Sequence, residues 1–273
     1  MTRHIQVAVV AVALIGSAIV LSAQQAGGRA GGPPAPPPTP QAGAPIDLTG
    51  YWVSVVTEDW RWRMVTPAKG DYAGIPMNAA SKTVADAWDP AKDEAAGEQC
   101  KSYGAPAIMS VPGRIRITWQ DDSTLKVETD AGQQTRLLKF GAPAAPAAKA
   151  PPSWQGTSVA QWQMSAAGLP LMLRPQERAA DVPAPAAVRG GTLKVTTTNL
   201  RAGYLRRNGV PYSAGAVLTE YWDLTKAGND TLLTVTQIVD DPTYLRTRRL
   251  IAYPFKKEAN GDKWDPTPCS ARW

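Results

Sequence analysis

Apolar and polar residues alternate with a period of two through most of the regular parts of this chain of 273 residues. Successive side chains of a β-strand point to opposite faces, so this alternation predicts strands with one buried and one solvated face. Aspartate- and glycine-containing turns separate the segments at steady spacing, which is typical of an antiparallel sandwich or barrel. The expected strands are 50–56, 60–64, 114–119, 124–128, 134–140, 159–165, 169–174, 192–198, 203–206, 217–225, 231–239 and 245–253.

The strand expected at 60–64 has the most regular pattern of all. In Trp60-Arg61-Trp62-Arg63-Met64 the two tryptophans and the methionine would be buried, and the two arginines would face water. Two short helices interrupt the strands. The first is expected over Asn78 to Trp88 and the second over Pro90 to Cys100, where proline suits the first helical turn.

The N-terminus predicts export. Arg3 and His4 precede an apolar run from Ile5 to Leu21, and the small residues Ser22-Ala23 follow as a candidate cleavage site. This is the arrangement of a cleaved secretory signal peptide. A retained anchor is the alternative, but the run is short for a bilayer span and no basic cluster follows it. We therefore expect a periplasmic or extracellular protein with no membrane span after cleavage.

The remainder divides into a linker and one domain. Residues 24–45 are rich in proline, glycine and alanine, and they hold too little apolar surface to offset chain entropy. Residues 46–273 are expected to form a single β-domain with a proline- and alanine-rich loop at 142–152. The 29 basic and 23 acidic residues are scattered, so a nucleic-acid interface is not expected.

Cys100 and Cys269 are the only cysteines. An even number of cysteines in an oxidising compartment favours a disulfide, which would close a very long loop. Two free thiols, buried or reactive, are the alternative.

The single histidine, His4, lies in the predicted signal peptide. The mature chain would therefore lack imidazole, which excludes histidine-based triads and zinc centres, and we expect neither a metal nor a cofactor. The remaining acid–base candidates are carboxylates, Glu58 or Asp59 with Glu220 or Asp223, each set flanked by tryptophan. A glycosidase needs two carboxyl groups roughly 5–9 Å apart across a cleft. Hairpin turns and outward-facing carboxylates explain the same residues without catalysis.

Tryptophan and tyrosine greatly outnumber phenylalanine, with ten, eight and two residues. Both side chains combine a large apolar body with a polar tip, which suits an amphipathic ligand in the mouth of a barrel. Core filling is the alternative. The candidate ligand-binding residues are Trp60, Trp62, Trp119, Tyr221 and Trp222.

The segment Asp47-Leu48-Thr49-Gly50-Tyr51-Trp52 resembles the Gly-x-Trp start of lipocalin-like (calycin) barrels. The resemblance implies that Trp52 closes one end of a barrel and that an arginine of a late strand packs over it. It does not choose among Arg246, Arg248 and Arg249. Most of residues 46–269 also resembles a group of uncharacterised exported bacterial proteins, which implies a shared fold but no activity. The matching features are Asp47–Trp52, Ala87–Pro90, Cys100, Gly104, Pro106, Met109, Glu220–Asp223, Asp241-Pro242, Tyr244 and the late cysteine.

The expected fold is therefore all-β, an antiparallel lipocalin-like barrel or meander with one or two short helices inserted. Extra length at 66–110 and 142–190 exceeds a plain eight-stranded barrel. The expected function is binding of a small hydrophobic or amphipathic molecule. A carboxylate-based carbohydrate-active enzyme and a structural or interaction module of the envelope remain alternatives, and the sequence sets neither the ligand nor the oligomeric state.

Overall fold

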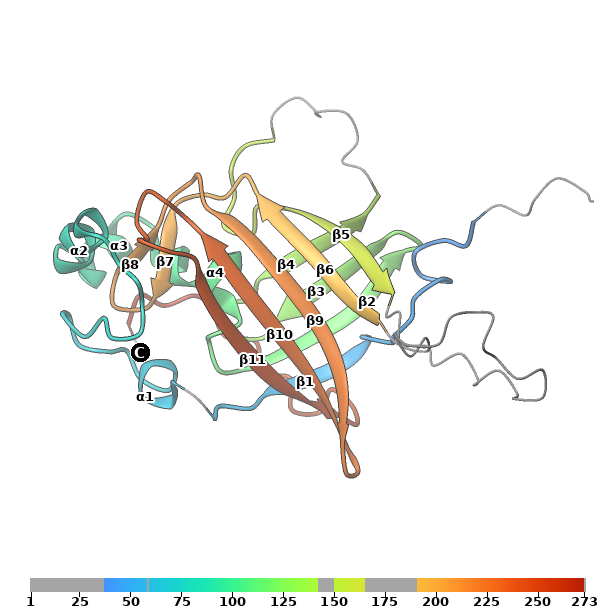
Figure 1. Cartoon of the computed structure of the whole chain (residues 1–273). Coiled ribbons are helices and arrows are strands. Elements are labelled where there is room, and N and C mark those ends of the chain that lie inside the picture. Colours follow the sequence, from blue (N-terminus) through green and yellow to red (C-terminus); the bar gives the residue numbers. More distant parts are fainter. Residues whose placement is uncertain (1–36, 58, 142–149, 165–190, 273) are drawn as a thin grey trace, which may run out of the picture. The chain divides into compact units, whose positions relative to one another are not determined.

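The computed structural model describes residues 37–57, 59–141, 150–164 and 191–272 (Figure 1). The predicted signal peptide at 1–23 and the strand expected at 169–174 lie outside these residues. One compact unit begins at Pro38 and contains every helix and strand of the described part.

Nine strands close into a barrel, which confirms the all-β prediction. Eight of the nine strand pairings that close the barrel are antiparallel, and the pairing of β4 with β5 is parallel. The strands follow the order β1-β11-β10-β9-β6-β5-β4-β3-β2, and β7 pairs with β8 in a separate hairpin. Their bounds are β1 Gly50–Ser54, β2 Arg114–Asp121, β3 Thr124–Thr129, β4 Thr135–Phe140, β5 Thr157–Met164, β6 Gly191–Thr198, β7 Gly203–Arg206, β8 Val210–Tyr212, β9 Val217–Ala227, β10 Asp230–Asp240 and β11 Arg249–Glu258.

Short helices gather near one end of the barrel (Figure 1). Both predicted helices are confirmed. The Asn78 side chain accepts a hydrogen bond from the Ser81 amide at 2.9 Å at the start of the first, and Pro90 opens the second. We call this helix-bearing end the capped end and the opposite end the mouth. The helices are α1 Trp60–Arg63, α2 Ala79–Asp86, α3 Pro90–Ala95, the 3₁₀ helix η1 Gln99–Tyr103 and α4 Ala105–Ile108.

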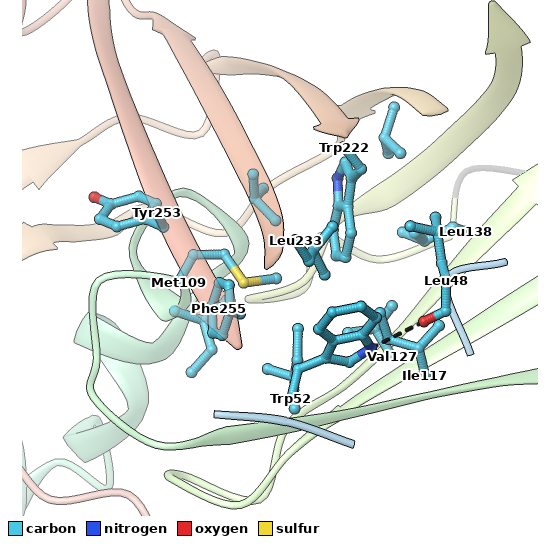
Figure 2. Packing of buried hydrophobic residues seen from close by; sticks show 14 of the residues in the cluster. Leu48, Trp52, Met109, Ile117, Val127, Leu138, Trp222, Leu233, Tyr253 and Phe255 are labelled. Atoms are coloured by element: carbon cyan, nitrogen blue, oxygen red, sulfur yellow. Dashed lines mark hydrogen bonds between the residues drawn. The ribbon is translucent and has the colours of Figure 1, made fainter. Parts of the chain in front are cut away.

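Buried side chains from all nine strands fill the interior of the barrel. Figure 2 shows Trp52 and Trp222 at its centre, and neither ring is exposed to solvent. The Trp52 indole Nε1 donates a hydrogen bond to the Leu48 carbonyl at 3.0 Å, so its polar tip is satisfied where its ring is buried (Figure 2). The interior is therefore a packed core rather than an open calyx around these two rings.

The strand predicted at 60–64 is wrong, because these residues form the single helical turn α1. Asp59 precedes it in the left-handed region at φ 54°, which turns the chain away from an extended path. The expected burial is also reversed for three of these five side chains. Trp60 is 64% exposed and Met64 54%, whereas Arg63 is only 5% exposed. Arg63 is held by distant groups, since its Nε donates to the Ser110 carbonyl at 3.0 Å. Long-range packing therefore overrode the local alternation.

The predicted disulfide is confirmed. The Sγ atoms of Cys100 and Cys269 are 2.09 Å apart and join η1 to the C-terminal segment across 169 positions of the sequence. The cation over Trp52 is a lysine and not one of the three expected arginines, since the Nζ atom of Lys257 lies 5.2 Å from the centroid of that ring. Of the three arginines, Arg248 pairs instead with Asp240 at the surface.

Candidate functional site

The five tryptophan and tyrosine residues predicted to bind ligand do not come together. Trp222 lies in the core, and Tyr221 points to the outer face of β9, because neighbouring strand residues face opposite ways. Trp60 and Trp62 belong to α1 at the capped end. Trp119 is near the end of β2 at the mouth, beside the β2–β3 turn. Of the five, Trp119 alone lies in a partly exposed aromatic cluster at the mouth.

The described candidate catalytic carboxylates lie on different elements and in different surroundings. Glu58 lies outside the described residues, and Asp59 precedes α1. Glu220 points into the barrel, whereas Asp223 lies on the outer face of β9 and accepts a hydrogen bond from the Thr192 hydroxyl. Of the two β9 candidates, Glu220 is therefore enclosed in the barrel and Asp223 lies outside it, so only Asp223 is placed to join Glu58 or Asp59 at a surface cleft of the kind that glycoside hydrolysis needs.

Glu220 belongs to a buried polar cluster that was not predicted from the sequence. Its carboxylate accepts two hydrogen bonds from Arg136 of β4, at 3.0 Å from Nη1 and 2.5 Å from Nη2, and neither side chain is exposed. The Gln237 side-chain amide of β10 donates to Glu220 at 2.9 Å and to the Ala105 carbonyl of α4 at 3.3 Å. The only local signal is an arginine at an inward position of an alternating strand. The cluster joins three strands to the helical cap, which is a structural role.

Three aromatic rings pack against one another in tilted pairs at the mouth of the barrel. The ring centroids of Trp119 and Phe140 are 5.6 Å apart at an interplanar angle of 30°, and those of Phe140 and Trp162 are 5.2 Å apart at 36°. They project from β2, β4 and β5, and all three are partly buried. We call them the mouth trio. Phe140 and Trp162 were not predicted, although both occupy inward positions of alternating strands.

The end of the predicted linker lies on this trio. The Trp162 indole Nε1 donates to the Pro40 carbonyl at 2.8 Å, and the Gln41 amide donates to the Asp122 carbonyl at 3.1 Å. Between this segment and the barrel is a groove of about 500 Å³, within the size range of small-molecule sites. Its lining residues are Gln41, Ala44, Pro45, Ile46, Asp47, Thr49 and Trp119.

The rim of the groove carries a negative charge. Partial burial alone would raise the pKa of Asp47, but hydrogen bonds from Thr49 and the charge of Lys257 hold this pKa below its usual value. The Thr49 amide and hydroxyl donate to Asp47 Oδ1 at 2.9 and 2.7 Å. Asp47 is therefore ionised at neutral pH beside an aromatic wall, so the groove offers both apolar and polar contacts.

Within the described residues no group of three or more histidine, cysteine, aspartate or glutamate side chains is placed to hold a metal ion. In the same part of the chain, none of the helices has the length and apolar character needed to cross a bilayer. No known protein family, curated protein or solved structure matches this chain.

Proposed function

We propose that this chain is an exported binding protein for a small hydrophobic or amphipathic molecule, and that the ligand lies in the groove at the mouth of the barrel. The observation that carries the proposal is the mouth trio beside a groove of about 500 Å³. Aromatic rings that cluster and keep some exposure favour a flat or elongated apolar ligand, because ring-to-ring contact with the ligand adds to simple area burial. Trp119 is the ring that reaches the groove directly.

The segment over the groove supports a site that opens. It contains Pro40 and Pro45 and is held through few hydrogen bonds, one of them to the Trp162 indole. A ligand that displaces this segment would gain the faces of the mouth trio without opening the packed core around Trp52 and Trp222. Binding at the mouth therefore costs less than binding in the centre of the barrel, where buried rings would have to be expelled.

Two observations support export. The first 23 residues have the organisation of a signal peptide. The pairing of Cys100 with Cys269 suits an oxidising compartment, where disulfides persist. A closed barrel that follows a Gly-x-Trp opening is compatible with a lipocalin-like architecture, which commonly encloses or carries small ligands.

The test is a fluorescence titration of the purified protein with 1-anilinonaphthalene-8-sulfonate. We expect saturable binding and quenching of tryptophan emission. Trp119→Ala should raise the Kd about tenfold, which corresponds to about 1.4 kcal/mol. Trp119→Phe keeps an apolar ring and should stay within about threefold of the wild type.

Trp60→Ala is the matched control, because Trp60 is a tryptophan of the capped end with most of its surface already in water. Its Kd should equal that of the wild type within about twofold. Far-ultraviolet circular dichroism checks that each variant is folded. Absence of saturable binding, or equal weakening by Trp60→Ala and Trp119→Ala, would refute a ligand site at the mouth.

A further inference from the structure

Three buried arginines converge at the capped end of the barrel, at the opposite end from the mouth trio. Arg63 comes from α1, Arg206 from the end of β7 and Arg249 from the start of β11 (Figure 1). They are only 5%, 7% and 7% exposed. Together they line a hollow of about 20 Å³, enough for one water-sized group. The other lining residues are Asp59, Trp62, Ser110, Leu205, Ile251 and Tyr253.

The charges of these arginines are poorly compensated. A buried guanidinium is normally paired with a carboxylate, as Arg136 is with Glu220 in the same barrel. By contrast, no carboxylate of the described chain forms an ion pair with Arg63, Arg206 or Arg249. Asp59 lines the hollow and offsets part of the charge. Asp71, which is itself paired with Arg61, also attracts Arg206. Among the described residues that line the hollow, three guanidiniums face one carboxylate, which leaves an excess of positive charge.

Backbone carbonyls and the Tyr253 hydroxyl accept hydrogen bonds from only some of the N–H groups of these three arginines. Arg63 Nε donates to the Ser110 carbonyl at 3.0 Å, and Arg206 Nη1 donates to the Asp71 carbonyl at 3.4 Å. Arg249 Nη2 reaches the Tyr253 hydroxyl at 3.5 Å. Two further donors, Arg63 Nη2 and Arg249 Nη1, are buried and have no hydrogen-bond partner among the described residues. Buried donors without partners are costly and rare in native proteins, so they point to an absent acceptor.

Aromatic rings position the guanidiniums but do not neutralise them. Arg206 lies 4.8 Å from the centroid of the Trp62 ring, and Arg63 lies 5.1 Å from that of Tyr253. Burial and the neighbouring charge of Arg249 lower the pKa of Arg206 to about 10, and burial lowers that of Arg63. Arg206 therefore remains cationic at neutral pH. A bound anion would relieve both the burial of charge and the mutual repulsion.

We propose that this arginine cluster binds a small oxyanion, with one oxygen in the hollow between the partnerless donors of Arg63 and Arg249. Guanidinium groups match the geometry of phosphate and carboxylate oxygens and form strong charge-assisted hydrogen bonds with them. The oxyanion is either a free ion or the acidic group of a small organic molecule. This site is separate from the mouth, so the two proposals succeed or fail independently.

The test is isothermal titration calorimetry of the purified protein with inorganic phosphate and, separately, with acetate. Ionic strength is held constant with sodium chloride, because nonspecific attraction of anions is screened by salt. We expect saturable binding of at least one of the two oxyanions. Stronger binding of phosphate indicates a tetrahedral ligand such as a phosphate ester, and stronger binding of acetate indicates a carboxylic acid.

Arg249→Gln should weaken this binding at least tenfold. Arg248→Gln is the matched control, since Arg248 is the adjacent arginine, is paired with Asp240 and has a side chain that is 71% exposed. Its affinity should change less than twofold. If Arg249→Gln does not fold, Arg206→Gln replaces it with the same expected loss. Absence of saturable binding by both oxyanions, or equal losses in the Arg248 and Arg249 variants, would overturn the proposal.

Discussion

Neutralising Glu220 should destabilise the barrel strongly. In Glu220→Gln the shape of the side chain is kept, but Arg136 becomes a buried charge without a counter-ion. The variant loses a two-point contact with N–O distances of 3.0 and 2.5 Å between groups with no exposed surface. Removing one partner of such a pair costs about 3–5 kcal/mol of unfolding free energy. The lower part of this range is expected here, because the glutamine carbonyl can still accept one hydrogen bond.

The assay is equilibrium unfolding in urea, an uncharged denaturant, followed by tryptophan fluorescence with the disulfide intact. Asp240→Asn is the control, because it breaks the exposed pair with Arg248 and should cost less than about 0.5 kcal/mol. The double variant Arg136→Met/Glu220→Leu replaces the pair with apolar groups and should lie within about 1 kcal/mol of the wild type. A loss below about 1 kcal/mol in Glu220→Gln would refute the reasoning, as would a double variant no more stable than the single one.

Three further predictions concern stability, each measured by the same urea unfolding. Replacing both Cys100 and Cys269 by serine should lower the free energy of unfolding by about 5 kcal/mol, because the disulfide closes a loop across 169 positions and so limits the entropy of the unfolded chain. A loss below about 1 kcal/mol would contradict this expectation. Gly132→Ala should cost about 2–3 kcal/mol, because Gly132 has φ 76° and an added Cβ would lie 2.2 Å from the Tyr103 ring; a neutral effect would contradict this packing. Burial raises the pKa of Asp130 above its ordinary value of 3.8, so just above that pH the folded state binds more protons than the unfolded chain and the free energy of unfolding falls as the pH rises. Asp130→Asn should remove this contribution to the slope of unfolding free energy against pH, and an unchanged slope would count against it.

The strands were predictable because one face of each is buried, so the period of two is imposed by the core itself. In β9 and β10, for example, Trp222 and Val235 are cross-strand partners on the inward face. The boundaries of these two strands differ from the prediction by two residues at most. Helix signals were equally local, as the cap at Asn78 and the opening proline at Pro90 show.

The residues that the sequence could not place depend on contacts between distant segments. Arg136 and Glu220 are separated by 84 positions, and the local sequence around each residue does not indicate that the two will pair. Arg63 lies in an alternating pattern that predicts a solvated arginine, yet contacts with Ser110 and Tyr253 bury it. Composition identified an excess of tryptophan but not its distribution, which depends on how the barrel closes.

The most direct test of a ligand site at the mouth is nuclear magnetic resonance of the indole N–H groups of the ten tryptophans. In a titration with 1-anilinonaphthalene-8-sulfonate, the signals of Trp119 and Trp162 should shift with one shared Kd. The Trp162 shift should be the larger, because displacement of the covering segment breaks its hydrogen bond to the Pro40 carbonyl. The signals of Trp60 and Trp222 should stay within about one linewidth of their starting positions. Saturable binding that shifts Trp60 or Trp222 and leaves Trp119 and Trp162 unchanged would contradict the proposed site.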